Sequence, residues 1–176
     1  MAMTTMSGRS WLMGPFSSLG LWAAILTFAL DQTHKWWMLA IYRIQEKGRV
    51  ALTSFLDLVF VTNKGVSYGM FAQDGHGGQW VLAAFAVAVS LAMVIWLARG
   101  VTNTISALGF GLIIGGALGN ALDRVLLGGV ADFFSLHAWG YYWYVFNIAD
   151  IAIVAGVVGL LYDSFVPVRD DASKSS

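Results

Sequence analysis

The chain has 176 residues, of which 58% are hydrophobic and only 11% are charged, with ten basic and ten acidic residues that cancel. Soluble domains typically carry about 25% charged residues, and a chain of this size has too little interior to hide so much apolar surface, so the composition indicates a membrane protein. The balanced charge and the lack of a basic cluster give no sign of a nucleic-acid partner, and none is expected. The absence of cysteine excludes disulfides, a thiol nucleophile and thiolate metal sites.

Four segments are predicted to be membrane-spanning helices, because about 20 apolar residues cross the hydrocarbon core. They lie at roughly 17–40, 79–98, 102–122 and 145–166. The first overlaps an uncharged run over 11–30 that exceeds the usual length of a signal peptide and has no clear cleavage site. We therefore expect a span there rather than a cleaved leader.

A stripe of small residues marks the third predicted span. Its members recur every four residues and are Ala107, Gly111, Gly115 and Gly119. Residues four apart share a helix face, and small side chains on that face let two helices approach closely in a membrane. We expect this span to pack tightly against another helix.

Residues 43–78, between the first two predicted spans, contain several charges and glycines and the β-forming run from Phe55 to Thr62. The fold class we expect is a mainly α membrane protein with four transmembrane helices and a small extramembrane β-containing element at 43–78, between helices 1 and 2. The whole chain, 1–176, is predicted to be one membrane-embedded domain. Tyr141-Tyr142-Trp143-Tyr144, before the fourth span, is predicted to be an aromatic cluster at the membrane–water interface.

Ionisable groups within or beside the spans are functional candidates, because charge inside a bilayer is costly. Asp31 and Lys35 are four residues apart on one helix face, which predicts a structural ion pair. Asn120 and Asp123 share a face at the end of the third span. The neighbouring Arg124 is expected to pair with Asp123 or with another carboxylate.

Asp132 and Asp150 have more apolar sequence neighbours. Those around Asp132 favour the protonated acid, and Asp150, three residues after Asn147, is interpreted as too deep in an apolar segment for a simple helix cap. Two facing carboxylates can share the work of hydrolysis, one accepting a proton from water and the other polarising the carbonyl. Asp123, Asp132 and Asp150 are all candidates, and the sequence favours the last two because Asp123 adjoins an arginine.

Two other functions fit the same residues. A small proton-coupled transporter could use the intramembrane acids as a proton relay. A non-catalytic membrane assembly factor could use the two Asn-x-x-Asp pairs to hold helices together.

Five blocks of this sequence resemble the signature of bacterial lipoprotein signal peptidase, or signal peptidase II. They are Asp31-Gln-Thr-His-Lys35, Asn63-Lys-Gly65-Val-Ser-Tyr-Gly69, Gly115-Gly-Ala-Leu-Gly-Asn120-Ala-Leu-Asp123-Arg124, Val130-Ala-Asp132-Phe133 and Phe146-Asn-Ile-Ala-Asp150. The blocks occur in the family's order and spacing, from about residue 20 to 165. Each block alone is weak evidence for the resemblance, but the five together are specific to this family.

The resemblance implies an intramembrane aspartyl endopeptidase that removes signal peptides from diacylglyceryl-modified prolipoproteins, cleaving before the lipid-modified cysteine. It implies that no metal or other cofactor is needed. It also implies that globomycin inhibits the enzyme. The family's catalytic pair falls on Asp132 and Asp150. The positions that support the pair or bind substrate fall on Asp31, Lys35, Asn63, Gly65, Asn120, Asp123, Arg124 and Asn147.

The family's topology implies a multi-pass protein of the bacterial inner membrane, with both termini cytoplasmic and the active site near the periplasmic face. Its expected partners are membrane lipid and the prolipoprotein substrates, and we expect a monomer. The sequence departs from the usual family pattern at Tyr68, Ala131 and Ile151. These departures bear on the substrate pocket rather than on the reaction.

Overall fold

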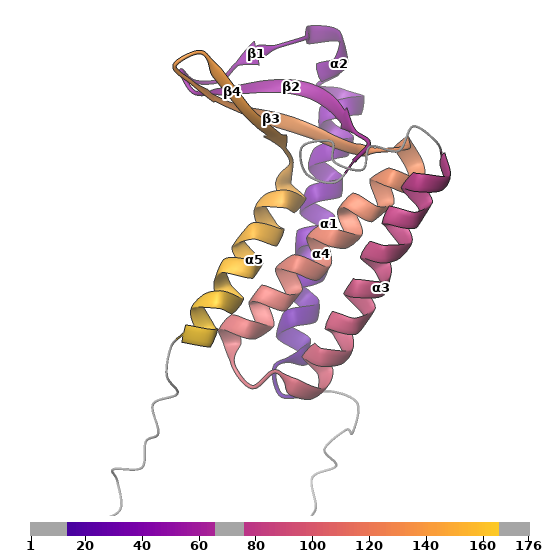
Figure 1. The fold of residues 1–176 in the computed structure, drawn as a ribbon, viewed down its shortest axis with the longest axis vertical. Coiled ribbons are helices and arrows are strands. Elements are labelled where there is room, and N and C mark those ends of the chain that lie inside the picture. The colour runs from indigo at the N-terminus through magenta and orange to yellow at the C-terminus, as the bar shows by residue number, and fades with distance from the viewer. Residues whose placement is uncertain (1–13, 66–75, 166–176) are drawn as a thin grey trace, which may run out of the picture.

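The computed structural model describes residues 14–65 and 76–165. In chain order its elements are α1 (Ser17–Trp36), the π-helical turn η1 (Trp37–Ile41), α2 (Ile44–Lys47), β1 (Val50–Ala51), β2 (Leu56–Asn63), α3 (His76–Gly100), α4 (Thr104–Leu127), β3 (Val130–Ala138), β4 (Tyr141–Phe146) and α5 (Ile148–Phe165). The four long helices run side by side, and the strands form a sheet across one end of them (Figure 1). The protein is therefore mainly helical with a small β element, as expected.

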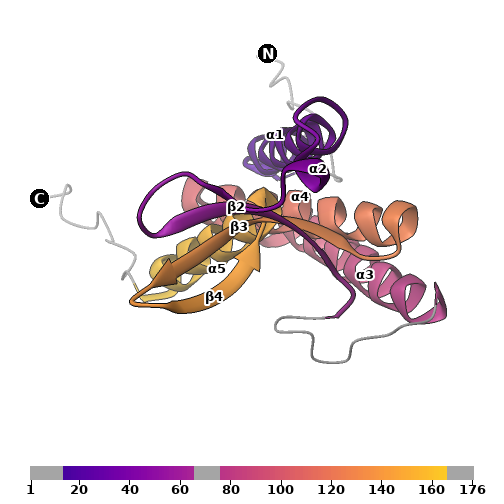
Figure 2. The ribbon, with the colours of Figure 1, turned by 90° about the horizontal axis from the view of Figure 1, so that it is seen from above.

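Helix α4 is the centre of the bundle. It packs against α1, α3 and α5, and the view from above shows it between α1 on one side and α3 and α5 on the other (Figure 2). Its buried side chains and those of its neighbours form a core that includes Ala24, Leu97, Phe110 and Ile114. Because α4 contacts all three other long helices, residues at its sheet end can meet groups from each of them.

Three helical segments in the described part of the chain are long and apolar enough to cross a membrane: Gly77–Gly100, Thr104–Leu127 and Ile148–Phe165. These correspond to the second, third and fourth predicted spans. Helix α1 does not join them, because polar residues that include Asp31 and Lys35 occupy its last turns and lower its hydropathy. The prediction of four spans is thus supported for three.

The sheet is antiparallel with the order β1-β2-β3-β4. The predicted β element between the first two helices supplies β1 and β2, but the sheet also includes β3 and β4, which come from the connection between α4 and α5 and were not predicted. A two-residue turn joins them at Trp139 and Gly140, whose φ angles of 50° and 80° suit the right-handed twist of a hairpin. The fourth helix accordingly starts at Ile148 rather than near 145, because β4 continues to Phe146.

A second hydrophobic cluster holds the sheet on the end of α1. Met38 and Ile44 from the α1 end pack against Leu58 of β2 and against Ala131 and Phe133 of β3. Fully burying a side chain of the size of Phe133 stabilises the fold by about 1.5–3 kcal/mol. This packing fixes the strand that carries Asp132.

The small-residue stripe on α4 does face another helix, as predicted. A Cβ atom added to Gly111 would overlap the carbonyl oxygen of Gly20, and one added to Gly115 would overlap that of Ala24. Helices α1 and α4 therefore approach more closely than side chains of ordinary size would allow. The close approach continues to Gly119, where Asp31 of α1 lies against the glycine.

Candidate active site

Two carboxylates from different elements share one asparagine. Asp132 lies on β3 and Asp150 in the first turn of α5, and Asn147 is the residue between β4 and α5. The Asn147 Nδ2 donates to Asp132 Oδ1 at 2.6 Å, and the Asn147 backbone N donates to Asp150 Oδ2 at 3.1 Å. This hydrogen-bonding brings together the two aspartates that the sequence singled out.

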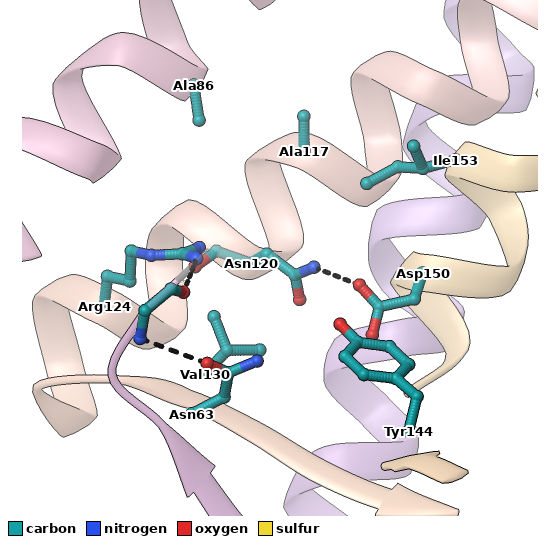
Figure 3. A pocket seen from close by; sticks show the side chains of 10 residues that line it. Asn63, Ala86, Ala117, Asn120, Arg124, Val130, Tyr144, Asp150 and Ile153 are labelled. Atoms are coloured by element: carbon teal, nitrogen blue, oxygen red, sulfur yellow. Dashed lines mark hydrogen bonds between the residues drawn. The ribbon is translucent and has the colours of Figure 1, made fainter. Parts of the chain in front are cut away.

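Each carboxylate also receives a second side-chain amide. Asn63 Nδ2, from the end of β2, donates to Asp132 Oδ2 at 3.2 Å. Asn120 Nδ2, from α4, donates to Asp150 Oδ1 at 2.9 Å (Figure 3). Amide donors fix the orientation of both groups without supplying a neutralising charge.

Asp150 has a capping role that we had rejected from the sequence. Asn147 directly precedes α5, and its Oδ1 accepts a hydrogen bond from Asp150 N at 3.0 Å. With the bond from Asn147 N to Asp150 Oδ2, this makes a reciprocal capping box. The interpretation that Asp150 lies too deep for a cap was wrong because α5 begins only at Ile148.

A buried lysine connects two further carboxylates around the pair. Lys35 Nζ lies 2.8 Å from Asp31 Oδ2, as the spacing predicted, and 2.7 Å from Asp123 Oδ2. It also donates to Asn120 Oδ1 at 3.0 Å. All four side chains are buried, so the lysine charge is satisfied entirely by protein groups.

These two flanking carboxylates hold the backbone next to each candidate catalytic aspartate. Asp123 Oδ2 accepts from Ala131 N, the residue before Asp132, at 3.1 Å. Asp31 Oδ1 accepts from Ala149 N, the residue before Asp150, at 3.0 Å. The ion-paired cluster is thus a frame that sets the positions of β3 and α5 relative to each other.

The prediction that Arg124 pairs with Asp123 or another carboxylate was wrong. Its guanidinium donates to the carbonyl oxygens of Asn120 at 3.1 Å and Gly65 at 3.2 Å, while Asp123 is occupied by Lys35. A helix places residues 123 and 124 about 100° apart, so the two side chains point in different directions. Gly65 is further held by its own N–H, which donates to Asn63 Oδ1.

Sequence reasoning missed one member of the frame, Gln32. Its Nε2 donates to Asp31, to Asp123 and to the carbonyl oxygen of Gly119, at 3.1–3.2 Å. Gln32 lies inside the Asp31–Lys35 block, and a polar amide at that depth in a spanning segment was the signal that could have identified it.

A cavity of about 200 Å³ opens beside the pair (Figure 3). It is lined by side chains from β2, α3, α4, β3, β4 and α5, namely Asn63, Gly65, Ala86, Ala117, Asn120, Arg124, Val130, Tyr144, Asp150 and Ile153. Asp150 lines this space, whereas Asp132 is 1% exposed and is not part of the lining. Tyr144, predicted only as an interfacial aromatic residue, belongs to the cavity wall.

Burial makes the Asp132 carboxyl group a weaker acid than usual. Removal from water, and secondly the charge of Asp150, raise the pKa of Asp132 from 3.8 to about 7. The hydrogen bonds from Asn63 and Asn147 and the charge of Lys35 oppose this rise. An aspartate with this pKa can hold a proton near neutral pH and release it during a reaction.

The three departures from the family pattern have different positions. Tyr68 lies outside the described residues. Ala131 is fully buried in the cluster beneath the sheet, and Ile151 is exposed on α5, outside the cavity wall. Among the described residues no group of three or more His, Asp or Glu side chains is placed to hold a metal ion.

The fold and site define a membrane protein with a pair of amide-held carboxylates at the sheet end of its helical bundle. The family model described as signal peptidase (SPase) II matches residues 23–166, and the chain belongs to this family of peptidases. Family membership favours the peptidase interpretation over a transporter or an assembly factor.

Individual relatives agree with this assignment. A lipoprotein signal peptidase of Rhodopseudomonas palustris (strain TIE-1) is 49% identical over 152 residues, covering 84% of this chain and 92% of the relative. One from Beijerinckia indica subsp. indica is 46% identical over 163 residues, covering 89% and 97%. A solved bacterial membrane enzyme has the same fold, with a TM-score of 0.76 at 23% identity, covering 94% of this chain and 98% of the other.

Proposed function

We propose that this chain is an aspartic endopeptidase that removes signal peptides from diacylglyceryl-modified prolipoproteins, cleaving before the lipid-modified cysteine. Its relatives in the family are lipoprotein signal peptidases. The observation that supports the aspartic mechanism is that Asn147 donates hydrogen bonds to both Asp132 and Asp150. Two carboxylates held in this way can divide the roles of acid and base.

The two aspartates take different roles because their surroundings differ. Asp150 faces the cavity, where a water molecule and the scissile bond would meet, so it accepts the proton from water. Asp132, buried and with its pKa raised to about 7, donates its proton to the carbonyl oxygen as the water oxygen bonds to the carbon. The proton on Asp150 then passes to the leaving nitrogen as the C–N bond breaks, and Asp132 takes back the hydroxyl proton as the carbonyl re-forms, which restores both aspartates.

Neighbouring residues position the peptide. Arg124 and Asn63 line the cavity, and their side-chain donors suit the carbonyl oxygens of an extended peptide. Asn120 and Asn147 orient the carboxylates, and Asp31, Lys35 and Asp123 hold the surrounding backbone. No step requires a metal or another cofactor.

The membrane holds the lipid part of the substrate. The three candidate spans expose large apolar side chains, among them Val81, Phe85, Leu126 and Val158. Helix α1 also exposes Trp22, Leu26 and Leu30, which supports the proposal that it is the first span of the chain. The diacylglyceryl chains would remain in lipid while the peptide enters the cavity between the helices and the sheet.

Four spans place both termini on one side. In the proposed orientation that side is the cytoplasm, and the sheet and cavity lie near the periplasmic face of the bacterial inner membrane. The chain acts there as a monomer and one domain, and we expect globomycin to inhibit it.

A gel-shift assay on a purified diacylglyceryl-modified prolipoprotein tests this function. The wild-type protein should cleave it in a globomycin-sensitive manner, and Asp132→Asn and Asp150→Asn should each abolish cleavage while the protein remains inserted. Asp163→Asn is the matched control, since Asp163 lies on α5 but pairs with Asn103 and Ser106 away from the cavity. Near-normal cleavage by either dyad variant would refute the aspartic mechanism.

A further inference from the structure

The cavity wall contains a phenol on the Asp150 side. Tyr144 is the fourth residue of β4, three residues before Asn147, and it lines the same cavity as Asp150, Asn120 and Arg124. Its ring is partly buried, and its hydroxyl points into the cavity toward the Asp150 carboxylate (Figure 3). By contrast, Tyr141 at the start of the same strand is exposed at 74%.

Asp132 and Asp150 each accept hydrogen bonds from two N–H groups described above. Asp132 receives the side-chain amides of Asn63 and Asn147. Asp150 receives the side-chain amide of Asn120 and the backbone N–H of Asn147. These four bonds, all between residues that the structure describes, do not by themselves decide which aspartate is ionised. A carboxylate offers about four acceptor positions, so Asp150 has capacity for a further donor from the cavity side.

We propose that Tyr144 is a positioning residue for the proposed reaction, whose hydroxyl donates to Asp150 when substrate fills the cavity. A third donor favours the ionised form of Asp150, so this aspartate acts as the base and the proton of the pair resides on Asp132. A tyrosine suits this task because its hydroxyl stays protonated near neutral pH and can only donate to a carboxylate. The inference rests on the proposed peptidase function.

The other charged groups around Asp150 are the same with or without the hydroxyl. They come from α1, where Asp31 and Lys35 lie, from β3, where Asp132 lies, and from α4, where Arg124 lies. Replacing Tyr144 with phenylalanine keeps the ring and changes none of these charges. A change in pH dependence therefore reports the hydroxyl itself.

The test compares pH profiles of cleavage for the wild type, Tyr144→Phe and the control Tyr141→Phe, using a fluorogenic peptide with a diacylglyceryl-cysteine. Losing one hydrogen bond to a charged group should lower kcat about 10-fold with little change in KM. The carboxylate of the enzyme–substrate complex should also keep its proton to higher pH, moving the acidic limb of kcat upward by about one pH unit. Tyr141→Phe should match the wild type.

The outcomes separate the two proposals. A wild type that does not cleave the lipidated peptide overturns the proposed function. A wild type that cleaves, with a Tyr144→Phe profile superimposable on its own, overturns the role of Tyr144 alone. A raised KM with an unmoved acidic limb also overturns it, because Tyr144 would then only shape the peptide-binding wall.

Discussion

Asn147 donates its side-chain amide to Asp132 across the gap between the α5 N-terminus and the sheet, at 2.6 Å. The same residue caps α5 and so fixes Asp150 in the first helical turn. One side chain thus determines the separation of the two proposed catalytic carboxylates, although it takes no part in proton transfer itself.

Replacing Asn147 with alanine should therefore affect both catalysis and folding. Loss of a preorganised donor at a reacting group costs about 10²-fold in kcat. Loss of the helix cap lowers the free energy of unfolding by about 1 kcal/mol. The buried hydrogen-bond partners that the Asn147 side chain leaves unpaired add about 1–3 kcal/mol to this loss. Cleavage rates at saturating substrate and thermal unfolding in detergent measure the two effects.

Asn103 provides the matched control for this substitution. It caps α4, with its side chain accepting from Ser106 N at 2.9 Å, at the far end of the bundle from the cavity. Asn103→Ala should lower the free energy of unfolding by the cap contribution of about 1 kcal/mol and retain normal cleavage. Equal losses of activity in the two variants would contradict a positioning role for Asn147.

The pH dependence of cleavage should show a decline above about pH 7. The pKa of Asp132 is raised to about 7, so above that pH the pair loses the proton it needs for the carbonyl oxygen. The amide of Asn63 opposes this rise, because its hydrogen bond favours the ionised carboxylate. Asn63→Leu should raise the pKa further and move the alkaline limb of kcat/KM to higher pH.

Thr62→Val is the control for Asn63→Leu, since Thr62 is exposed on the same strand. The alkaline limb of the Thr62→Val variant should stay in place.

The raised pKa of Asp132 also has a consequence for stability. Between about pH 4 and pH 7 the folded protein keeps a proton on Asp132 that the unfolded chain releases, so this group makes the free energy of unfolding fall as pH rises. An alkaline limb that moved to lower pH in Asn63→Leu would refute the assignment.

Local spacing predicted the parts of the site that one helix contains. Asp31 and Lys35 face each other because residues four apart share a helix face, and the stripe through Gly111 and Gly115 was predicted by the same rule. The second partner of Lys35 is Asp123, on another helix. Nothing in the neighbourhood of either residue encodes that contact, so Asp123 was wrongly paired with its sequence neighbours.

The sheet shows a second limit of sequence reasoning. Strand β4 is rich in aromatic residues, which are typical both of strands and of membrane interfaces, and the composition does not separate the two. The turn at Trp139-Gly140 lacks the Asn-Gly signature that marks many hairpins. Tyr144 was missed for the same reason, because its place in the cavity depends on how β4 pairs with β3.

Removing the charge of Lys35 should destabilise the protein strongly. In Lys35→Met, Asp31 and Asp123 would remain buried without a cation, and breaking a buried ion pair from one side costs about 3–5 kcal/mol. Unfolding in detergent measures the loss. The triple variant Asp31→Asn, Lys35→Met, Asp123→Asn should regain part of it, because the uncompensated charges are gone.

The exposed pair between Arg43 and Glu46, 2.6 Å apart, gives the comparison for Lys35. Glu46→Gln should change the free energy of unfolding by less than about 1 kcal/mol, since water replaces the lost interaction. A Lys35→Met variant as stable as Glu46→Gln would show that the buried cluster does not hold α1 against α4.

The close approach of α1 and α4 makes Gly115 sensitive to a single methyl group. Its Cβ would overlap the Ala24 carbonyl oxygen, which belongs to helix backbone and cannot rotate away, so Gly115→Ala should lower the free energy of unfolding by about 1–3 kcal/mol. The shift would also move Asp31 and Lys35 relative to Asp123, so cleavage should fall with it. Gly77→Ala, where an added Cβ meets nothing within 4 Å, should leave both unchanged. If Gly115→Ala were as stable and active as Gly77→Ala, the glycine contact would not set the geometry of the site.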